Sequence, residues 1–205
     1  MKKLVSYLEK IFSIESIHPY PSLALGCIDC TLQQKVAMFN IFANNGVYVS
    51  PFLVKWIKDP WGKKIWKHES QLKRIFSSLV SDQVTKALSL SMERARRRNP
   101  ANWIKSESIG KTGTNNDSRT CCFIGSTPEL TTGIYIGCDD NDSLGQNIYA
   151  SQAAFPPWLK LYQGLTPKKM HFLHHPDLKE IFVDYQTGKI ISQNSSRSIP
   201  ILIHS

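Results

Sequence analysis

The residues best suited to chemistry are Lys111-Thr112-Gly113-Thr114, where a cation, two hydroxyls and a glycine follow one another at the end of an expected strand. Lys-Thr-Gly on a strand is one of three motifs that a class of serine acyl-transferases shares, the others being Ser-x-x-Lys and Ser-x-Asn. The chemistry would then be transfer of an acyl group by way of a serine ester. The tripeptide alone is weak evidence, because short motifs arise by chance and a sheet edge with an exposed lysine would read the same.

A strand that bears this motif needs a sheet to hold it, and the surrounding pattern predicts one. Alternating apolar residues separated by turn residues predict strands over residues 103–114, 120–126 and 131–138. Helical spacing and end signals predict helices over residues 1–14, 31–44, 79–98 and 152–162. We therefore expect an α+β fold in which helices pack on one antiparallel sheet.

Two hairpins and a tail complete the expected elements. Residues 47–58 and 63–67 flank the turn Asp59-Pro60-Trp61-Gly62, and residues 182–191 form a second hairpin around Thr187-Gly188. The Ser-rich tail from residue 192 to 205 is expected to be loosely held. Of the five tryptophans, we expect only Trp61 to be an exposed contact and the others to cover the core: Trp56, Trp66, Trp103 and Trp158.

Charge and hydropathy restrict the possible partners without choosing one. The net charge of +9 favours anionic surroundings, whether lipid headgroups, nucleic acid or carboxylate-bearing substrates. No segment has the length of a membrane span. The basic N-terminus is not expected to be an export signal, because Glu9 and Lys10 interrupt it before an apolar region forms.

Three clusters suggest other functions, and for each we favour a structural explanation. Cys27-x-x-Cys30 could be a zinc or redox motif, but no second ligand pair follows at metal-binding spacing, so we expect the five cysteines to be small buried thiols. His171, His174 and His175 could suggest a metal, but Pro176 disfavours the helix that would bring them together. The arginines at 94 and 96–98 match the dipole at a helix end better than they indicate nucleic-acid binding.

Several phrases in series carry a resemblance to a known family. They are Pro21-Ser22-Leu23-Ala24-Leu25-Gly26, Phe42-Ala43-Asn44-Asn45-Gly46-Val47-Tyr48-Val49, residues 110–119 around the motif, Phe123-Ile124-Gly125-Ser126-Thr127-Pro128-Glu129-Leu130 and residues 131–140. In this order they resemble the C-terminal half of the transpeptidase domain of class A (bifunctional) penicillin-binding proteins, from about Pro19 to about Tyr162. The resemblance implies a penicillin-recognising α+β fold and D,D-transpeptidase chemistry on peptidoglycan stem peptides, which β-lactams mimic. A serine β-lactamase would share the fold and motif, but the flanking phrases do not favour it.

The resemblance also implies roles for the motif residues. Lys111 would place a cation beside the serine nucleophile and assist proton transfer. Thr112 and Thr114 would donate hydroxyl hydrogen bonds to the terminal carboxylate of the substrate, and the Thr114 N–H would be an oxyanion-hole donor. Gly113 would let the strand approach the ligand closely. Catalysis would thus fall to Lys111 and Thr114, and substrate binding to residues 112–114, with no metal or cofactor.

The chain departs from the family pattern at the nucleophile. Its one Ser-x-x-Lys, Ser70-Gln71-Leu72-Lys73, precedes Lys111 by too few residues, and its one Ser-x-Asn, Ser192-Gln193-Asn194, follows the motif instead of preceding it. Both look accidental, so this chain alone is expected to be inactive. We expect residues 1–165 to be the C-terminal part of a transpeptidase domain and residues 166–205 a hairpin and tail.

Those departures leave two interpretations open. The upstream half of the same enzyme could complete the site, with stem peptides and β-lactams as ligands and no nucleic acid. Alternatively, the chain is a catalytically inactive remnant or binding module of the same fold. The family works at the outer face of the cytoplasmic membrane, but we expect neither a signal peptide nor a transmembrane helix in this chain.

Overall fold

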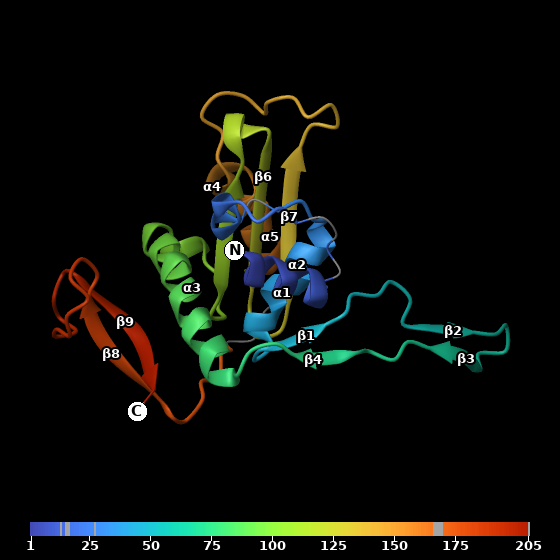
Figure 1. Ribbon diagram of the computed structural model, residues 1–205, viewed down its shortest axis with the longest axis horizontal. Coiled ribbons are helices and arrows are strands. Elements are labelled where there is room, and N and C mark those ends of the chain that lie inside the picture. Colours follow the sequence, from blue (N-terminus) through green and yellow to red (C-terminus); the bar gives the residue numbers. More distant parts are fainter. Residues whose placement is uncertain (13, 15–16, 27, 166–169, 205) are drawn as a thin grey trace.

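A three-stranded antiparallel sheet lies at the centre of the molecule (Figure 1). The computed structural model describes residues 1–12, 14, 17–26, 28–165 and 170–204. The strands are β5 (Ile109–Thr114), β6 (Thr120–Ser126) and β7 (Thr131–Gly137), paired in the order β5-β6-β7. Together with the helices that cover it, this sheet confirms the predicted α+β class.

The first predicted strand starts later than expected, at Ile109 instead of residue 103. A short 3-10 helix, η2 (Pro100–Asn102), precedes it, and the backbone between them is held by a different segment. Glu107 N–H donates to Met170 O (2.9 Å), and the Glu107 carboxylate accepts from Phe172 N–H (2.9 Å). These two bonds tie Glu107 to residues 170–172, so its backbone N–H is not available to pair with β6.

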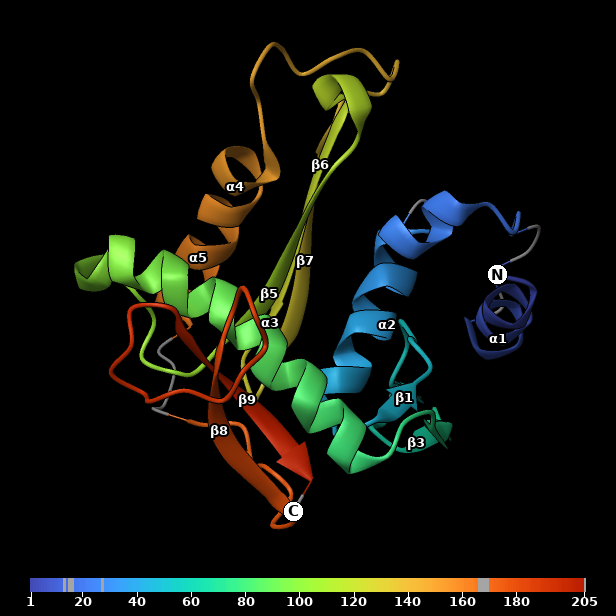
Figure 2. The same ribbon diagram turned by 60° about the vertical axis from the view of Figure 1, so that its left-hand side comes forward.

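Helices cover both faces of the sheet (Figure 2). Helix α2 (Leu32–Ala43) lies on one face, and the short α4 (Ala150–Ala153) and α5 (Phe155–Gly164) lie on the other. Successive side chains of a strand point to opposite faces. Phe123 accordingly packs toward α5, whereas Cys122 and Ile124 face α2.

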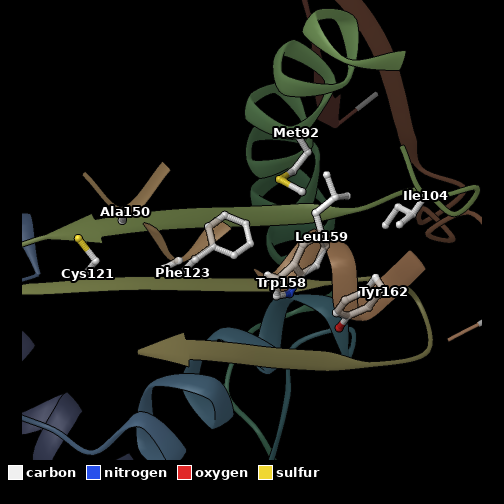
Figure 3. Close-up of a cluster of buried hydrophobic side chains, with 9 residues drawn as sticks. Met92, Ile104, Cys121, Phe123, Ala150, Trp158, Leu159 and Tyr162 are labelled. Carbon is white, nitrogen blue, oxygen red and sulfur yellow. The ribbon is translucent and has the colours of Figure 1, made fainter. Parts of the chain in front are cut away.

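The core on the α5 side is aromatic and tightly packed (Figure 3). The fully buried Trp158 stacks on Tyr162 with ring centroids 4.2 Å apart and meets Phe123 edge-on at 5.2 Å. A Cβ at Gly125 would lie 2.6 Å from the Trp158 indole, closer than real Cβ contacts allow. Glycine is therefore required here so that the indole can lie directly on β6.

Side-chain caps set the starts of the two long helices. Thr31 and Gln34 form a reciprocal capping box at α2, with bonds of 3.1 and 2.9 Å. The Ser77 hydroxyl caps α3 (Ser78–Arg98) by accepting from Val80 N–H. Buried Ser81 and Thr85 of α3 donate to Phe42 O, and so satisfy a carbonyl at the end of α2.

The N-terminal part adds a second, smaller core. Helix α1 (Lys2–Phe12) packs against α2 through Ile11, Phe12 and Ile41, which are all buried. The short η1 (Pro21–Leu25) connects the two, and η3 (Asn116–Ser118) turns the chain between β5 and β6. Among the described residues, no helix combines the length and the apolar composition that crossing a membrane requires.

The predicted hairpin after α2 is present but contains two separate ribbons. β1 (Val47–Val49) pairs with β4 (Leu72–Arg74), and β2 (Trp56–Lys58) pairs with β3 (Lys64–Lys67). The β2–β3 ribbon extends away from the body of the molecule (Figure 1). The prediction that Trp56 and Trp66 cover the core is therefore wrong, because they are 41% and 45% exposed.

The C-terminal part differs most from the prediction. β8 (Leu178–Asp184) pairs over its whole length with β9 (Ser198–His204), so the tail is not loosely held. Only one bridge, between Val183 and Ile190, remains of the hairpin predicted over residues 182–191. The expectation of one sheet is also wrong, because the described strands form this and two other two-stranded ribbons beside the central sheet.

Polar contacts hold the β8–β9 ribbon in place. Lys86 of α3 forms an ion pair with Glu180 of β8, and the Gln83 amide donates to Leu202 O (3.1 Å). At the end of β8, Asp184 accepts from the Gln186 and Thr187 N–H groups and pairs with Arg197 at 2.9 Å. The Asp184 side chain is only 3% exposed, so these contacts replace the water around its carboxylate.

Candidate active site

The Lys-Thr-Gly motif lies on the outermost strand of the central sheet, next to α3. Residues 111–114 are all exposed, whereas Ile109 and Gly110 at the start of β5 are buried. The Ser91 hydroxyl of α3 donates to Gly110 O (3.1 Å), so this main-chain acceptor at the start of the outer edge is already occupied. The remaining edge, along Lys111–Thr114, is open to a ligand.

The pairing of β5 with β6 divides the four predicted residues between the two faces of the sheet. Lys111 lies opposite Ile124 and Gly113 opposite Cys122, so both belong to the face covered by α2. Thr112 and Thr114 lie on the other face, opposite Phe123 and Cys121. The four side chains therefore do not point in one direction, and the element they share is the backbone edge.

That edge presents the main-chain groups of the two threonines. Asn115 N–H bonds inward to Thr120 O (3.2 Å), and backbone groups of an antiparallel strand alternate in direction. The N–H and C=O of Thr112 and Thr114 consequently point away from β6. The Lys111 ammonium donates to the outward Thr112 O (2.9 Å), which draws the cation along the edge.

Thr114 is further fixed by a residue far along the chain. Its Oγ1 accepts a hydrogen bond from Ala150 N–H (3.0 Å) at the start of α4. A hydroxyl that accepts one bond still has its own hydrogen to donate. The contact thus orients the hydroxyl and leaves it able to donate to a ligand oxygen.

A cavity of about 390 Å³ lies beside Lys111, between β5, β6 and α2. Its apolar lining includes Met38, Phe39 and Ile124, and its cations are Lys35 and Lys111. A Cβ at Gly113 would meet only Cys122, at 3.9 Å, which is ordinary contact. The described residues thus do not themselves require glycine at 113.

Two thiols line the same cavity. Burial raises the pKa of both Cys30 and Cys122 above the usual value for cysteine, and Lys35 offsets part of each rise. A thiol with a raised pKa is mostly protonated at neutral pH and is a poor nucleophile. We therefore assign neither cysteine the part of an attacking group.

The family model for the penicillin binding protein transpeptidase domain matches residues 16–127, more than half of the chain. The chain belongs to this transpeptidase family. The match includes Lys111–Thr114, the capped helix α2 and the projecting β2–β3 ribbon. The resemblance read from the sequence phrases is thereby confirmed.

Curated relatives of this transpeptidase family are similar over most of the chain. Penicillin-binding protein 1A of Aquifex aeolicus is 30% identical over 167 residues, which are 80% of this chain and 22% of that protein. Penicillin-binding protein 1A of Rickettsia conorii is 28% identical over 194 residues, 82% of this chain and 24% of that protein. The chain therefore spans about a quarter of the length of these relatives.

Solved structures of the transpeptidase family share the fold. The crystal structure of penicillin-binding protein 1A from Haemophilus influenzae matches with a TM-score of 0.80 at 21% identity, covering 97% of this chain and 35% of that chain. PonA1 from Mycobacterium tuberculosis matches with a TM-score of 0.62 at 18% identity, covering 80% and 45%. The C-terminal β8–β9 ribbon thus falls largely within the part that resembles the Haemophilus structure.

The two nucleophile-like motifs lie away from Lys111. Ser70 is exposed in the connection before β4, and Lys73 lies on β4, so neither begins a helix as the transpeptidase motif would require. Ser192 and Asn194 lie in the turn between β8 and β9, where Ser192 bonds to its own neighbours. None of these residues lines the cavity beside Lys111.

The other clusters singled out in the sequence are the cysteines and the histidines at 171–175. Cys138 is exposed, so the prediction of buried thiols is wrong there, and Cys27 lies outside the described residues. His171 approaches Glu107 (3.7 Å) and His175 approaches Asp177 (3.7 Å). Within the described ranges, no three His, Cys, Asp or Glu side chains gather in a way that could hold a metal ion.

Three residues near the motif escaped the sequence analysis. Ala150 holds the Thr114 hydroxyl, Ser91 holds Gly110, and Lys35 adds a second cation to the cavity. Each lies far from the motif in sequence and belongs to a residue type common on helices. No local pattern marks them, so only the assembled fold identifies them.

Replacing Thr114 by valine should destabilise the protein, whereas serine should be tolerated. Valine keeps the shape but removes the acceptor for Ala150 N–H, and Ala150 is fully buried. A buried donor without a partner costs about 1–3 kcal/mol. Urea unfolding measures the loss, and hydrogen exchange at the Ala150 amide should accelerate in the valine variant only. Equal stability of the two variants would contradict the role of this bond.

Proposed function

We propose that this chain provides the Lys-Thr-Gly strand of a peptidoglycan D,D-transpeptidase site, which β-lactams also enter. The outward edge of β5 at Thr112 and Thr114, next to the Lys111 ammonium, supports the proposal most directly. An extended peptide can add to such an edge as a further strand, with main-chain bonds giving affinity. The stem peptide would lie there with its terminal carboxylate near the threonine hydroxyls.

The roles proposed for the motif follow from charge and geometry. Lys111 supplies a positive charge and a proton carrier beside the reacting carbonyl. The outward Thr114 N–H is a donor for the oxyanion, and the Thr114 hydroxyl, held by Ala150, binds the substrate carboxylate. Thr112 provides the second hydroxyl, and Gly113 keeps the strand free of a side chain between them.

The attacking serine is proposed to come from outside the 205 residues. Neither Ser70 nor Ser192 lines the cavity beside Lys111, and the two thiols there have raised pKa values. The apolar lining of that cavity suits the packing of a helix from another polypeptide or another part of the same one. The resemblance to class A penicillin-binding proteins implies work at the outer face of the cytoplasmic membrane, and we propose that location for the assembled site.

Labelling with a fluorescent penicillin tests the proposal. The chain is produced alone and together with the polypeptide encoded directly upstream. We expect a labelled band on the upstream polypeptide only when both are present, and none on this chain alone. Labelling of any serine of the chain by itself, or of neither protein in the mixture, would overturn the proposal and favour an inactive remnant or binding module.

A further inference from the structure

The projecting ribbon, defined here as residues 51–67, carries side chains that acyl transfer does not use. Every residue in it is exposed except Asp59, which is partly exposed. Trp61 at the tip is 88% exposed, and Trp56 and Trp66 are each more than 40% exposed. Three exposed tryptophans on one ribbon form an apolar surface, and contact between such a surface and water is unfavourable in free energy.

The projecting ribbon is also strongly basic. It contains one acidic residue, Asp59, against five lysines, at positions 55, 58, 63, 64 and 67. The Asp59 carboxylate is turned into the tip, where it accepts from Trp61 N–H (3.0 Å) and Lys63 N–H (2.8 Å). These bonds fix the turn that presents Trp61 and leave the lysines to set the outward charge. A partner of this surface must therefore be anionic.

Tryptophans lie on both faces of the projecting ribbon, and lysines surround one of them. Trp56 lies opposite Lys67 on one face, and Trp66 lies opposite Ile57 on the other. The ammonium groups of Lys55 and Lys64 lie 5.1 and 5.2 Å from the centre of the Trp56 ring. A rigid protein surface would cover one face and leave the other in water, whereas a fluid surface can surround the ribbon on all sides.

The projecting ribbon lacks neutral hydroxyl and amide side chains, which give directed hydrogen bonds to sugar hydroxyls and base edges. No Ser, Thr, Asn, Gln, Tyr or His occurs from residue 51 to 67. A glycan strand or a nucleic acid could be held here by ring stacking and charge, but not by directed hydrogen bonds from neutral side chains. Tryptophan, lysine and isoleucine are instead the composition of segments that lie at the lipid–water boundary.

We infer that the projecting ribbon enters the headgroup region of an anionic lipid surface, tip first. Trp61 and the other two tryptophans would lie at the level of the headgroups, with the lysine stems along the apolar boundary and their charges at lipid phosphates. This contact requires no membrane-spanning helix. It also requires no acyl transfer, so it can be tested apart from the proposed function.

Sedimentation of the 205-residue chain with vesicles tests the inference. The vesicles are phosphatidylcholine alone or phosphatidylcholine mixed with phosphatidylglycerol. We expect binding to the mixed vesicles only, with loss at high salt, and roughly fivefold weaker binding for each ribbon lysine removed in Lys63→Gln/Lys64→Gln. Trp61→Ser should weaken binding as well, because it removes the most exposed tryptophan. Circular dichroism checks that each variant is folded.

A matched control removes two exposed positive charges elsewhere. Arg94→Gln/Arg98→Gln lies at the end of α3 and should bind mixed vesicles like the unmodified chain. Equal weakening in the arginine and lysine pairs would show that net charge alone drives binding and would overturn the inference. Failure to bind mixed vesicles would overturn it too, as would ribbon-dependent retention by purified peptidoglycan or DNA in the absence of vesicle binding.

Discussion

Replacing Lys111 by alanine should slow penicillin labelling of the reconstituted enzyme by roughly 10²–10⁴-fold, the usual contribution of a group that transfers protons in the transition state. The side chain is exposed, and the bond that its ammonium makes within the described part of the chain is to the neighbouring Thr112 O, so the fold should not depend on it. The unfolding free energy should change by less than about 0.5 kcal/mol. The experiment measures the acylation rate by fluorescence in gel bands over a time course.

Lys179→Ala provides the matched control for that experiment. Lys179 is an exposed lysine on β8 at a distance from the motif, so its removal changes the net charge equally without touching the proposed site. Labelling should proceed at the unmodified rate. If Lys111→Ala and Lys179→Ala label equally fast, Lys111 takes no part in acylation and the proposed site is wrong.

Replacing Trp158 by alanine should cost about 3–5 kcal/mol of unfolding free energy, as expected for deleting a large buried aromatic side chain. The indole is fully buried, stacks on Tyr162 and covers Gly125 of β6, so its loss opens a void between the sheet and α5. Domains have only about 5–15 kcal/mol of stability, and a loss of this size should leave the variant partly unfolded at moderate temperature. Urea unfolding followed by far-UV circular dichroism gives the value.

Two other tryptophan variants make this result specific. Trp158→Phe keeps most of the buried area and removes an indole N–H that has no hydrogen-bond partner among the described residues, so its loss of stability should be clearly smaller. Trp61→Ala removes an exposed ring and should change stability by less than about 0.5 kcal/mol. A Trp158→Ala protein as stable as Trp61→Ala would show that the core is not organised around this residue.

The central sheet was predictable because its signals are local. Apolar residues alternate along β5, β6 and β7, and short polar turns separate these strands. The flanking phrases identify the family. The capping residue Thr31 also acts within a few positions of itself. The position of Lys111 on a strand follows from such patterns, whereas its place at the edge of the sheet follows from the strand order.

Partner choice between distant segments was not predictable in the same way. Val183 has two possible neighbours, and the chain forms a single bridge to Ile190 but a full ladder that includes Ile199. Ile199, Ile201 and Ile203 alternate as a strand should, yet the preceding serines favoured a loose tail. The Thr114–Ala150 bond spans a longer gap of 36 residues in sequence, and it sets the orientation of a proposed site hydroxyl.

The tryptophans of the projecting ribbon were misjudged for a different reason. Composition places large aromatic residues in a core on average, but burial needs a second layer to pack against. A two-stranded ribbon that leaves the body has no such layer, so Trp56 and Trp66 remain exposed. Residue type alone could not reveal how far the ribbon would extend.

The enclosed carboxylate of Asp184 gives the C-terminal part a sensitivity to acid. The hydrogen bond from Gln186 N–H, with those of Thr187 and the charge of Arg197, lowers the pKa of Asp184 below its ordinary value despite its burial. A lowered folded-state pKa means that the ionised carboxylate stabilises the protein above the unfolded pKa of about 3.9, and that this stabilisation disappears as the pH falls through the lower, folded value. Strong acidification would then loosen the turn that joins β8 to β9, because the Asp184 partners Gln186, Thr187 and Arg197 all lie in it, while the aromatic core, which depends on no ionised group, stays packed.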